Sequence, residues 1–172
     1  MVEPCASADA RRRSMPGTLL LVADQGVLLT GESGTGKSLL ALGLLDRGHT
    51  LICDDVVELE RRGDALLGFC PDALTATLEL RGAGLVDVRT LFGNGCWHRQ
   101  TAIDRVLHLQ PLNTARQWAD WPRPTGRHDR QMLEDLAIPR LTVPVGPRGI
   151  SPLLVESVVR TGSPVRVGER HG

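Results

Sequence analysis

The chain has 172 residues, enough for one domain with a sizeable hydrophobic core. Its 20 basic and 20 acidic side chains cancel, which excludes a global electrostatic field that would attract nucleic acid or an anionic membrane. Tyr is absent and Phe occurs only twice, so an aromatic platform for single-stranded nucleic acid is not expected. We therefore expect a partner that is recognised through local contacts.

The cysteines and the apolar runs restrict the compartment. No pair of the four cysteines has C-x-x-C spacing, so the sequence indicates neither a zinc ribbon nor a redox motif. No apolar run approaches the roughly 18 residues of a membrane span, and the N-terminus lacks a secretion signal of the usual length. Scattered thiols without such a signal are typical of a reducing compartment. We expect a cytoplasmic protein without a membrane or nucleic-acid partner.

Residues 1–60 contain the first predicted elements. Residues 1–16 are small, polar and basic, and predict a disordered tail. The apolar runs Thr18–Ala23 and Gly26–Thr30 predict a hairpin whose second strand leads into a glycine-rich loop. The Leu- and Ala-rich segment Ser38–Asp46, followed by Gly48, predicts a helix.

That loop, residues 31–38 (GESGTGKS), is a complete G-x-x-x-x-G-K-[ST] phosphate-binding motif between the predicted strand and helix. Its glycines let backbone N–H groups converge on phosphate oxygens at the helix N-terminus. Lys37 can reach the β- and γ-phosphates, and the Ser38 hydroxyl can hold Mg²⁺. The nucleotide-binding residues are therefore predicted to be Gly31, Glu32, Ser33, Gly34, Thr35, Gly36, Lys37 and Ser38.

The segments beyond the helix predict an α/β fold with a mixed sheet laid on the phosphate-loop core, because several short strands follow one another closely. Strands are expected at Thr50–Cys53, Val56–Glu60, Ala65–Phe69, Val106–Leu109 and Leu141–Val143. We expect a short helix or turn within Val86–Phe92, an irregular loop at Pro111–Arg127, a helix at Asp129–Leu136, a turn at Pro144–Gly149 and a strand or short helix at Leu153–Val159. The predicted domain covers residues 17–160, and residues 161–172 predict a frayed tail.

Three acidic residues, at two places in the chain, are candidates for catalysis and metal binding. Asp54 and Asp55 follow an apolar strand, where a carboxylate reaches a ligand in an α/β sheet. One carboxylate can hold the metal while the other takes a proton from an attacking hydroxyl; the alternative is a polar turn. Glu79 could complete the magnesium shell with Arg81 balancing its charge, although a surface ion pair explains the same spacing.

Two segments make the sequence similar to a known family. The first is the run from Gly26 through the loop to Ser38, followed by RGH at 47–49 and LICDD at 51–55. The second is LELRGAGLVDVRTLFG at 78–93, which resembles that family's signature segment. Together they resemble the HPr kinase/phosphorylase C-terminal catalytic domain, in a short form without the N-terminal domain. The resemblance covers roughly residues 17–159.

This resemblance implies a phosphate-loop fold similar to that of phosphoenolpyruvate carboxykinase, usually assembled as a hexamer. It implies an ATP- and Mg²⁺-dependent enzyme that phosphorylates a serine of the phosphocarrier protein HPr, or a paralogue, in the control of carbohydrate metabolism, and that reverses this by phosphorolysis. Asp55 would be the catalytic base, with Lys37 on the phosphates. Arg123 would be the catalytic arginine, and Ser38 and Glu79 would join Asp54 at the metal.

Three positions depart from the family pattern. Pro16-Gly17 stands where the family usually has His-Gly, Leu39 where it commonly has Glu, and Arg148-Gly149 where it has Arg-Asn. Proline cannot exchange protons or bind phosphate, and leucine removes a carboxylate beside the metal. Two alternatives to a protein kinase therefore stay open, namely an ATP-binding regulatory module with degenerate transfer and a small-molecule kinase on the same core.

Overall fold

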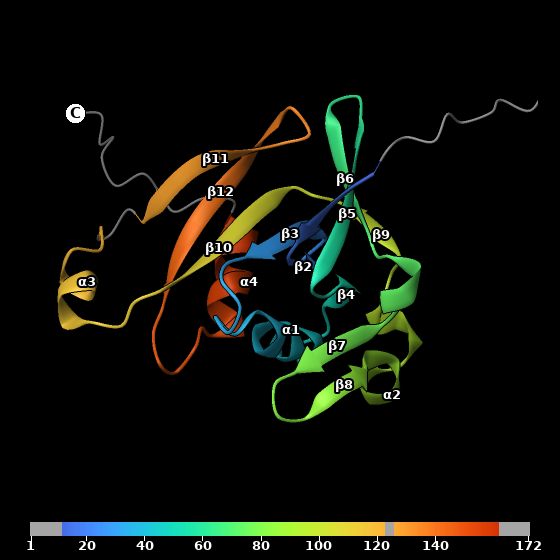
Figure 1. The fold of residues 1–172 in the computed structure, drawn as a ribbon, viewed down its shortest axis with the longest axis horizontal. Helices are drawn as coiled ribbons and strands as arrows, with labels where there is room; N and C mark the ends of the chain where they lie inside the picture. The colour runs from blue at the N-terminus through green and yellow to red at the C-terminus, as the bar shows by residue number, and fades with distance from the viewer. Residues whose placement is uncertain (1–11, 123–125, 162–172) are drawn as a thin grey trace, which may run out of the picture.

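A computed structural model describes residues 12–122 and 126–161, and its main feature is a six-stranded mixed sheet (Figure 1). Strand β3 lies near the middle and runs parallel to β10, which runs parallel to β12, while the other pairs are antiparallel. The strands in spatial order are β11 (Arg127–Leu133), β12 (Leu136–Val145), β10 (Arg105–Pro111), β3 (Gln25–Thr30), β2 (Thr18–Val22) and β4 (Thr50–Cys53). The predicted α/β class with a mixed sheet on a phosphate-loop core is confirmed.

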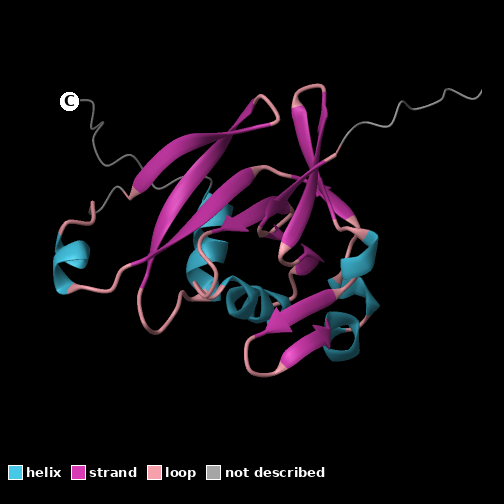
Figure 2. Ribbon diagram, in the orientation of Figure 1, coloured by secondary structure: helices cyan, strands magenta, loops and turns pink. Residues whose placement is uncertain are grey.

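Two smaller sheets complete the β-structure (Figure 2). A four-stranded antiparallel sheet has the order β1 (Arg13–Pro16), β5 (Val56–Arg62), β6 (Ala65–Phe69) and β9 (Gln100–Ala102). A separate hairpin pairs β7 (Thr77–Leu80) with β8 (Gly84–Asp87), and both strands lie within or next to the segment 78–93 that resembles the family signature. This hairpin lies beside the first long helix, at the edge of the molecule where the phosphate loop is found.

The helices are α1 (Lys37–Asp46), α2 (Val88–Phe92), α3 (Ala115–Ala119) and α4 (Pro152–Thr161), with 3-10 turns at Asp72–Leu74 and Asn94–Cys96. The predicted helix after the phosphate loop is confirmed as α1. The segment that was predicted as a strand or short helix is α4. None of the helices in the described ranges is long and apolar enough to cross a membrane.

The core has two halves, one on each face of the six-stranded sheet, because successive strand residues point to opposite faces. Leu29 packs with α1 and α4, whereas the neighbouring Leu28 packs toward β5 and β6 of the four-stranded sheet. Both leucines are fully buried. The protein therefore has a helix layer, a central sheet and a second sheet, with the phosphate loop at the end of β3.

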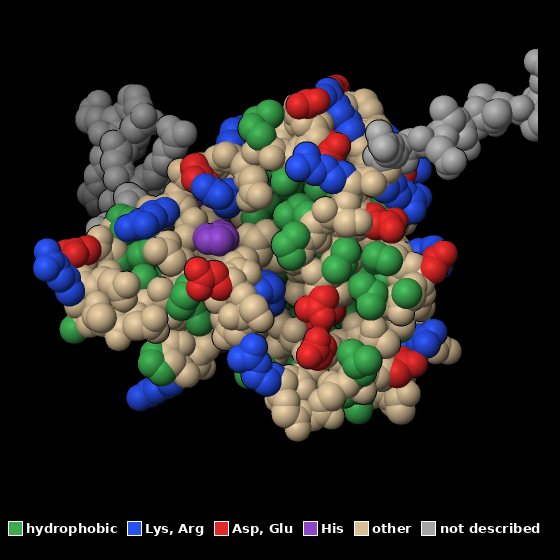
Figure 3. All heavy atoms as spheres, in the orientation of Figure 1, with side chains coloured by type: hydrophobic (Ala, Val, Ile, Leu, Met, Phe, Trp, Pro, Cys, Tyr) green, Lys and Arg blue, Asp and Glu red, His purple; other side chains and the backbone are tan. Residues whose placement is uncertain are grey.

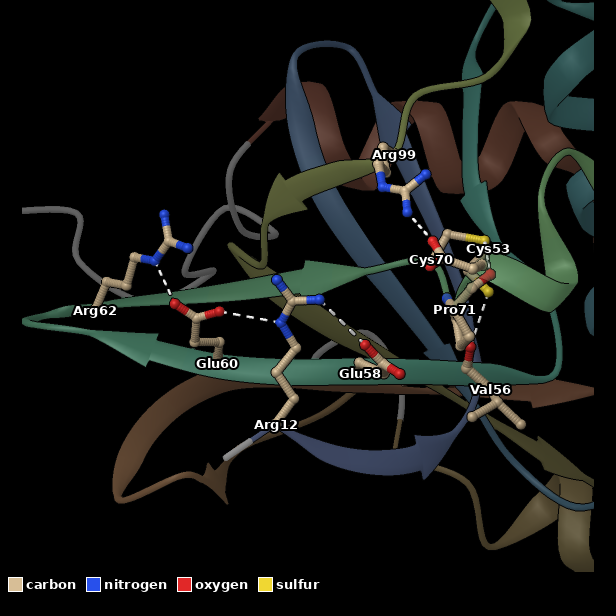
Figure 4. A network of polar contacts seen from close by, with 10 residues as sticks. Arg12, Cys53, Val56, Glu58, Glu60, Arg62, Cys70, Pro71 and Arg99 are labelled. Atoms are coloured by element: carbon tan, nitrogen blue, oxygen red, sulfur yellow. Dashed lines mark hydrogen bonds and ion pairs between the residues drawn. The ribbon is translucent and has the colours of Figure 1, made fainter. Parts of the chain in front are cut away.

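The prediction of a disordered tail up to Pro16 is wrong at its end, because residues 13–16 form β1 and pair antiparallel with β5. Arg12 donates to Glu60 at 3.1 Å and to Glu58 at 3.3 Å, and its guanidinium lies 3.7 Å from the centre of the Phe69 ring (Figure 4). These contacts attach the segment to the four-stranded sheet. Residues 1–11 and 162–172, which include both predicted tails, lie outside the described ranges.

The predicted helix at Asp129–Leu136 is also wrong, since this stretch forms most of β11, the hairpin turn and the first residue of β12. Its two connecting residues, Glu134 and Asp135, have φ values of 45° and 61°, as a two-residue hairpin turn of the favoured handedness requires. Asp129 forms an ion pair across the hairpin with Arg140, rather than capping a helix. Cross-strand pairing therefore decided the structure against a weak local helix signal.

The predicted irregular loop at Pro111–Arg127 contains a short helix, α3. Thr114 accepts a hydrogen bond from the Gln117 amide at 3.2 Å, while the Gln117 side chain accepts from the Thr114 amide at 3.0 Å. This reciprocal arrangement is a capping box, which supplies partners for amide groups that a helix start leaves free. The prediction of a fully irregular loop is therefore corrected to a loop with one capped helical turn.

Candidate functional site

The phosphate loop is ordered by its own contacts. The Lys37 ammonium donates to the carbonyl oxygens of Gly31 at 2.9 Å and Glu32 at 3.0 Å, so the side chain folds back across the loop. Thr35 donates to the Glu32 carbonyl at 2.9 Å. Gly31 has φ of 139°, and a Cβ there would lie 2.6 Å from the carbonyl oxygen of Leu109 on β10. Only glycine therefore fits where the loop leaves β3.

A cavity of about 460 Å³ opens between this loop and the β7–β8 hairpin. Figure 3 shows acidic and basic side chains side by side on this face, over α1 and the hairpin. The lining residues come from the loop and α1, from the end of β4 and from the hairpin, and they are Ser33, Gly34, Gly36, Lys37, Ser38, Leu39, Asp55, Glu79, Leu80, Arg81 and Ala83. The structure thus brings Asp55 and Glu79 to the same cavity as the phosphate loop.

Asp54 lies below the cavity floor, with 4% of its surface exposed. Its Oδ2 accepts from the Ser38 hydroxyl at 2.9 Å and from the Glu79 amide at 3.2 Å. Its Oδ1 accepts from the Thr18 hydroxyl at 2.6 Å. A hydroxyl and a carboxylate in contact offer oxygen ligands of the kind that Mg²⁺ prefers, so this part of the site fits the metal.

Asp55 turns in the other direction, into the cavity. Its backbone has φ of 66°, a region that L-residues rarely occupy, and its carbonyl accepts from the Gly17 amide at 3.0 Å. Partial burial raises the pKa of the Asp55 carboxyl, hydrogen bonding to Glu79 and the charge of Glu79 raise it further, and Lys37 opposes them. A carboxylate with a raised pKa beside a phosphate loop is suited to accept a proton.

Arg81 does not form the surface ion pair with Glu79 that the spacing allowed; the described residues contain no salt bridge between them. Instead its guanidinium lies over the phosphate loop. A Cβ built on Gly34 would be 3.1 Å from Nη1 of Arg81 and 3.3 Å from Nη2. The absence of a side chain at Gly34 therefore leaves room for a cation above the loop, where it can meet a phosphate oxygen.

Two of the remaining candidate positions can be compared with the cavity. Leu39 lines it with 68% of its surface exposed, so the position where the family commonly has Glu presents an apolar side chain. Arg148 is exposed in the turn between β12 and α4 and does not line the cavity. Arg123 falls in the gap at 123–125 and lies outside the described residues.

Two residues near the site were missed by sequence reasoning. Thr18 opens β2 and contacts Asp54 across 36 positions of sequence. His108 on β10 pairs in register with Thr30 at the end of β3, and its Nδ1 lies 3.0 Å from the Thr30 hydroxyl. Burial lowers the pKa of His108, with Arg140 adding to the effect. No spacing motif marks either residue, because only strand pairing brings them to the loop.

The cysteine that precedes the acidic pair belongs to the core. Cys53 is fully buried beside Cys70 (Figure 4). Its thiol donates to the Val56 carbonyl at 2.8 Å. Hydrogen bonding to Cys70 and burial both raise the pKa of the Cys53 thiol, so it stays protonated at neutral pH. A protonated thiol is a poor nucleophile, which leaves the carboxylates as the reactive groups of this strand end.

The comparisons with known proteins agree with this geometry. The family model of the HPr Serine kinase C-terminal domain matches residues 8–168. The HPr kinase/phosphorylase of Latilactobacillus sakei is 41% identical over 137 residues, which are 79% of this chain and 43% of the relative. That of Caldicellulosiruptor bescii is 39% identical over 162 residues, 92% of this chain and 50% of the relative.

A solved structure is also similar. The Hpr(Ser) kinase/phosphatase from Coxiella burnetii superposes with a TM-score of 0.77 at 30% sequence identity, covering 87% of this chain and 95% of that one. The chain spans about half the length, or slightly less, of the curated relatives that it matches.

Proposed function

The chain belongs to the HPr Serine kinase C-terminal domain family, and on this premise we propose that it transfers the γ-phosphoryl group of ATP to a serine of HPr or of a paralogous phosphocarrier protein. The observation that carries the proposal is the position of Asp55. A proton-accepting carboxylate with a raised pKa faces a cavity that it shares with Lys37 and the phosphate loop.

The nucleotide phosphates would lie along the loop. The backbone amides of residues 31–38 and the positive end of α1 would bind phosphate oxygens, and Lys37 would exchange its carbonyl contacts for the β- and γ-phosphates. Arg81, above Gly34, would add a second cation. The cavity of about 460 Å³ lies at this loop, on the side of the β7–β8 hairpin.

Ser38, Asp54 and Glu79 would hold Mg²⁺, which when bound neutralises the charge of the β- and γ-phosphates. Ser38 and Asp54 already touch at 2.9 Å. Glu79 lines the same cavity from β7, and its amide lies 3.2 Å from Oδ2 of Asp54. The three residues come from α1, from the position after β4 and from β7, so the fold and not a local motif assembles this set of metal ligands.

In the transfer step Asp55 acts on the acceptor. Its carboxylate accepts the proton of the serine hydroxyl as the serine oxygen bonds to the γ-phosphorus and the bond to the β,γ-bridging oxygen breaks, which releases ADP. Lys37 and Arg81 offset the charge on the phosphoryl oxygens. In phosphorolysis inorganic phosphate would attack the phosphorus of the phosphoserine, and the Asp55 carboxyl, now protonated, would donate its proton to the departing serine oxygen. Arg123 is proposed, by resemblance alone, as a further cation, and a homohexamer as the assembly.

The test is transfer of labelled γ-phosphoryl from ATP to HPr of the same organism. We expect Asp55→Asn to lower the rate by at least about 10²-fold while nucleotide affinity is retained, because general-base catalysis contributes roughly that much. Asp64→Asn, at the exposed β5–β6 turn, is the matched control and should transfer normally. Equal rates in the wild type and Asp55→Asn would refute the role of Asp55.

One observation favours the alternative of an ATP-binding regulatory module. Leu39, exposed at the cavity, and Pro16, on β1, stand where the family commonly has a carboxylate and a histidine. The same assay separates the two functions. ATP binding with no transfer to HPr in the wild type would support the module, whereas transfer that depends on Asp55 would exclude it.

A further inference from the structure

Asp54 has partners for both of its carboxylate oxygens, and the partner of Oδ1 belongs neither to the nucleotide motif nor to the cavity lining. Oδ2 faces Ser38 and the Glu79 amide, which belong to the cavity. Oδ1 accepts only from the Thr18 hydroxyl, at 2.6 Å. Thr18 has no exposed surface and Asp54 has 4%. Since no other described side chain donates to Oδ1, the Thr18 hydroxyl alone satisfies that buried oxygen.

The backbone next to this contact fixes its geometry. Gly17 donates to the Asp55 carbonyl at 3.0 Å, so two consecutive residues where β2 begins hold the two residues that follow β4. The register between β2 and β4 shifts between Leu19 and Leu20, immediately beside the contact. An irregularity of this kind re-aims a side chain at a strand end. A Cβ on Gly17 would lie 3.0 Å from the Leu29 carbonyl oxygen, so a larger residue would press on the backbone of β3.

We propose that Thr18 is a positioning residue of the metal site, whose hydroxyl fixes the rotation of the Asp54 carboxylate and directs Oδ2 at Ser38. The inference rests on the proposed function in that Asp54 and Ser38 are taken to hold the divalent cation. With both of its oxygens bonded, the carboxylate cannot rotate away from Ser38. Without the hydroxyl, Oδ1 loses the one partner that the described residues give it, and the carboxylate rotates toward other donors.

The experiment compares Thr18→Val, which keeps the shape and removes the hydroxyl, with Thr18→Ser, which keeps the hydroxyl. The probe is Mn²⁺, titrated into the intact chain with a non-hydrolysable ATP analogue and followed by electron paramagnetic resonance. Loss of such a supporting hydrogen bond typically costs 10–100-fold in metal affinity. We expect Thr18→Val to weaken Mn²⁺ binding by roughly this factor, and Thr18→Ser to restore it.

Two further measurements separate positioning from general structural damage. The affinity for the nucleotide analogue without metal, measured in EDTA, should be unchanged in Thr18→Val. Thr142→Val, at another buried strand threonine outside the cavity, should leave Mn²⁺ affinity unchanged. If Thr18→Val weakens metal-free nucleotide binding as much as Mn²⁺ binding, or if Thr18→Ser behaves like Thr18→Val, the inference is overturned.

This test needs no acceptor, so it can fail independently of the proposed function. If the wild type transfers no phosphoryl group to HPr, the kinase proposal fails, while the Mn²⁺ titrations still decide the role of Thr18. If transfer occurs and Thr18→Val binds Mn²⁺ as the wild type does, the kinase proposal stands and the role of Thr18 is refuted.

Discussion

Gly26 is the second residue of β3, the strand that leads into the phosphate loop, and it touches the backbone at the end of β9. A Cβ at this position would lie 1.7 Å from the carbonyl oxygen of Ala102 and 2.8 Å from its carbonyl carbon. The Gly26 amide also donates to the Asp104 carboxylate at 2.6 Å, and its carbonyl accepts from the Asp104 amide at 2.9 Å. Because the contact is with backbone, no side-chain rotation can relieve it. We predict that Gly26→Ala destabilises the fold.

The magnitude follows from these contacts. Overpacking a filled core costs about 1–3 kcal/mol, and each hydrogen bond lost as the connection retreats costs roughly 1 kcal/mol more. We expect a loss of about 3 kcal/mol in the free energy of unfolding. At about 2–4 °C per kcal/mol for a chain of this size, the melting temperature should fall by about 6–12 °C.

Urea denaturation followed by tryptophan fluorescence and circular dichroism measures this loss. Gly95→Ala is the control, because a Cβ at Gly95 would meet nothing within 4 Å. The control should stay within about 0.5 kcal/mol of the wild type. If Gly26→Ala also stays within that range at an unchanged denaturant slope, the close approach of the two backbones is refuted.

Three further predictions concern the site and its support. Glu79→Gln should move the acidic limb of the pH–rate profile for phosphoryl transfer to lower pH, because Glu79 raises the pKa of Asp55; an unchanged limb would contradict this. The carboxylate of Glu156, paired with Arg47 at 2.7 Å, has its pKa lowered from 4.5 to about 2, so it adds stability above its unfolded pKa that is lost as pH falls toward 2. Urea titrations at several pH values should therefore show that the free energy of unfolding of Glu156→Gln falls less steeply toward acid pH than that of the wild type. Equal slopes in the two proteins would exclude this contribution of Glu156. Gly31→Ala should weaken ATP binding about tenfold or more, because its Cβ would lie 2.6 Å from a backbone carbonyl oxygen. Calorimetry measures this affinity, and an unchanged affinity would show that the loop can shift.

The phosphate loop and the acidic pair could be predicted from sequence because their geometry is local. The glycine positions, Lys37 and Ser38 have fixed roles in a loop between a strand and a helix, and all of them lie in one run of eight residues. Asp54 and Asp55 are placed by the end of the apolar strand alone. The contact between Thr18 and Asp54 has no such local signal, since it depends on β2 lying between β3 and β4.

Strand β12 shows why the C-terminal third was harder to predict. Pro139 and Pro144 argue against a strand with neighbours on both sides, because proline cannot donate to a ladder. In the structure Pro139 is paired only with β11, since the β10 pairs begin at Arg140. Pro144 is paired only with β10, since the β11 pairs end at Thr142. Each proline thus lies where the strand has a single partner, a staggered arrangement that the sequence does not reveal.

At position 55, selection for stability and selection for activity are expected to favour different residues. Its φ of 66° is tolerated better by glycine or asparagine, and its carboxylate is held beside Glu79 with a raised pKa, so an ionised side chain there disfavours the folded state. A library of this chain screened only for heat resistance should therefore enrich Asp55→Asn or Asp55→Gly. A screen for phosphoryl transfer should return Asp at the same position. A substitution at position 55 that raises the melting temperature is therefore expected to lower the rate of phosphoryl transfer.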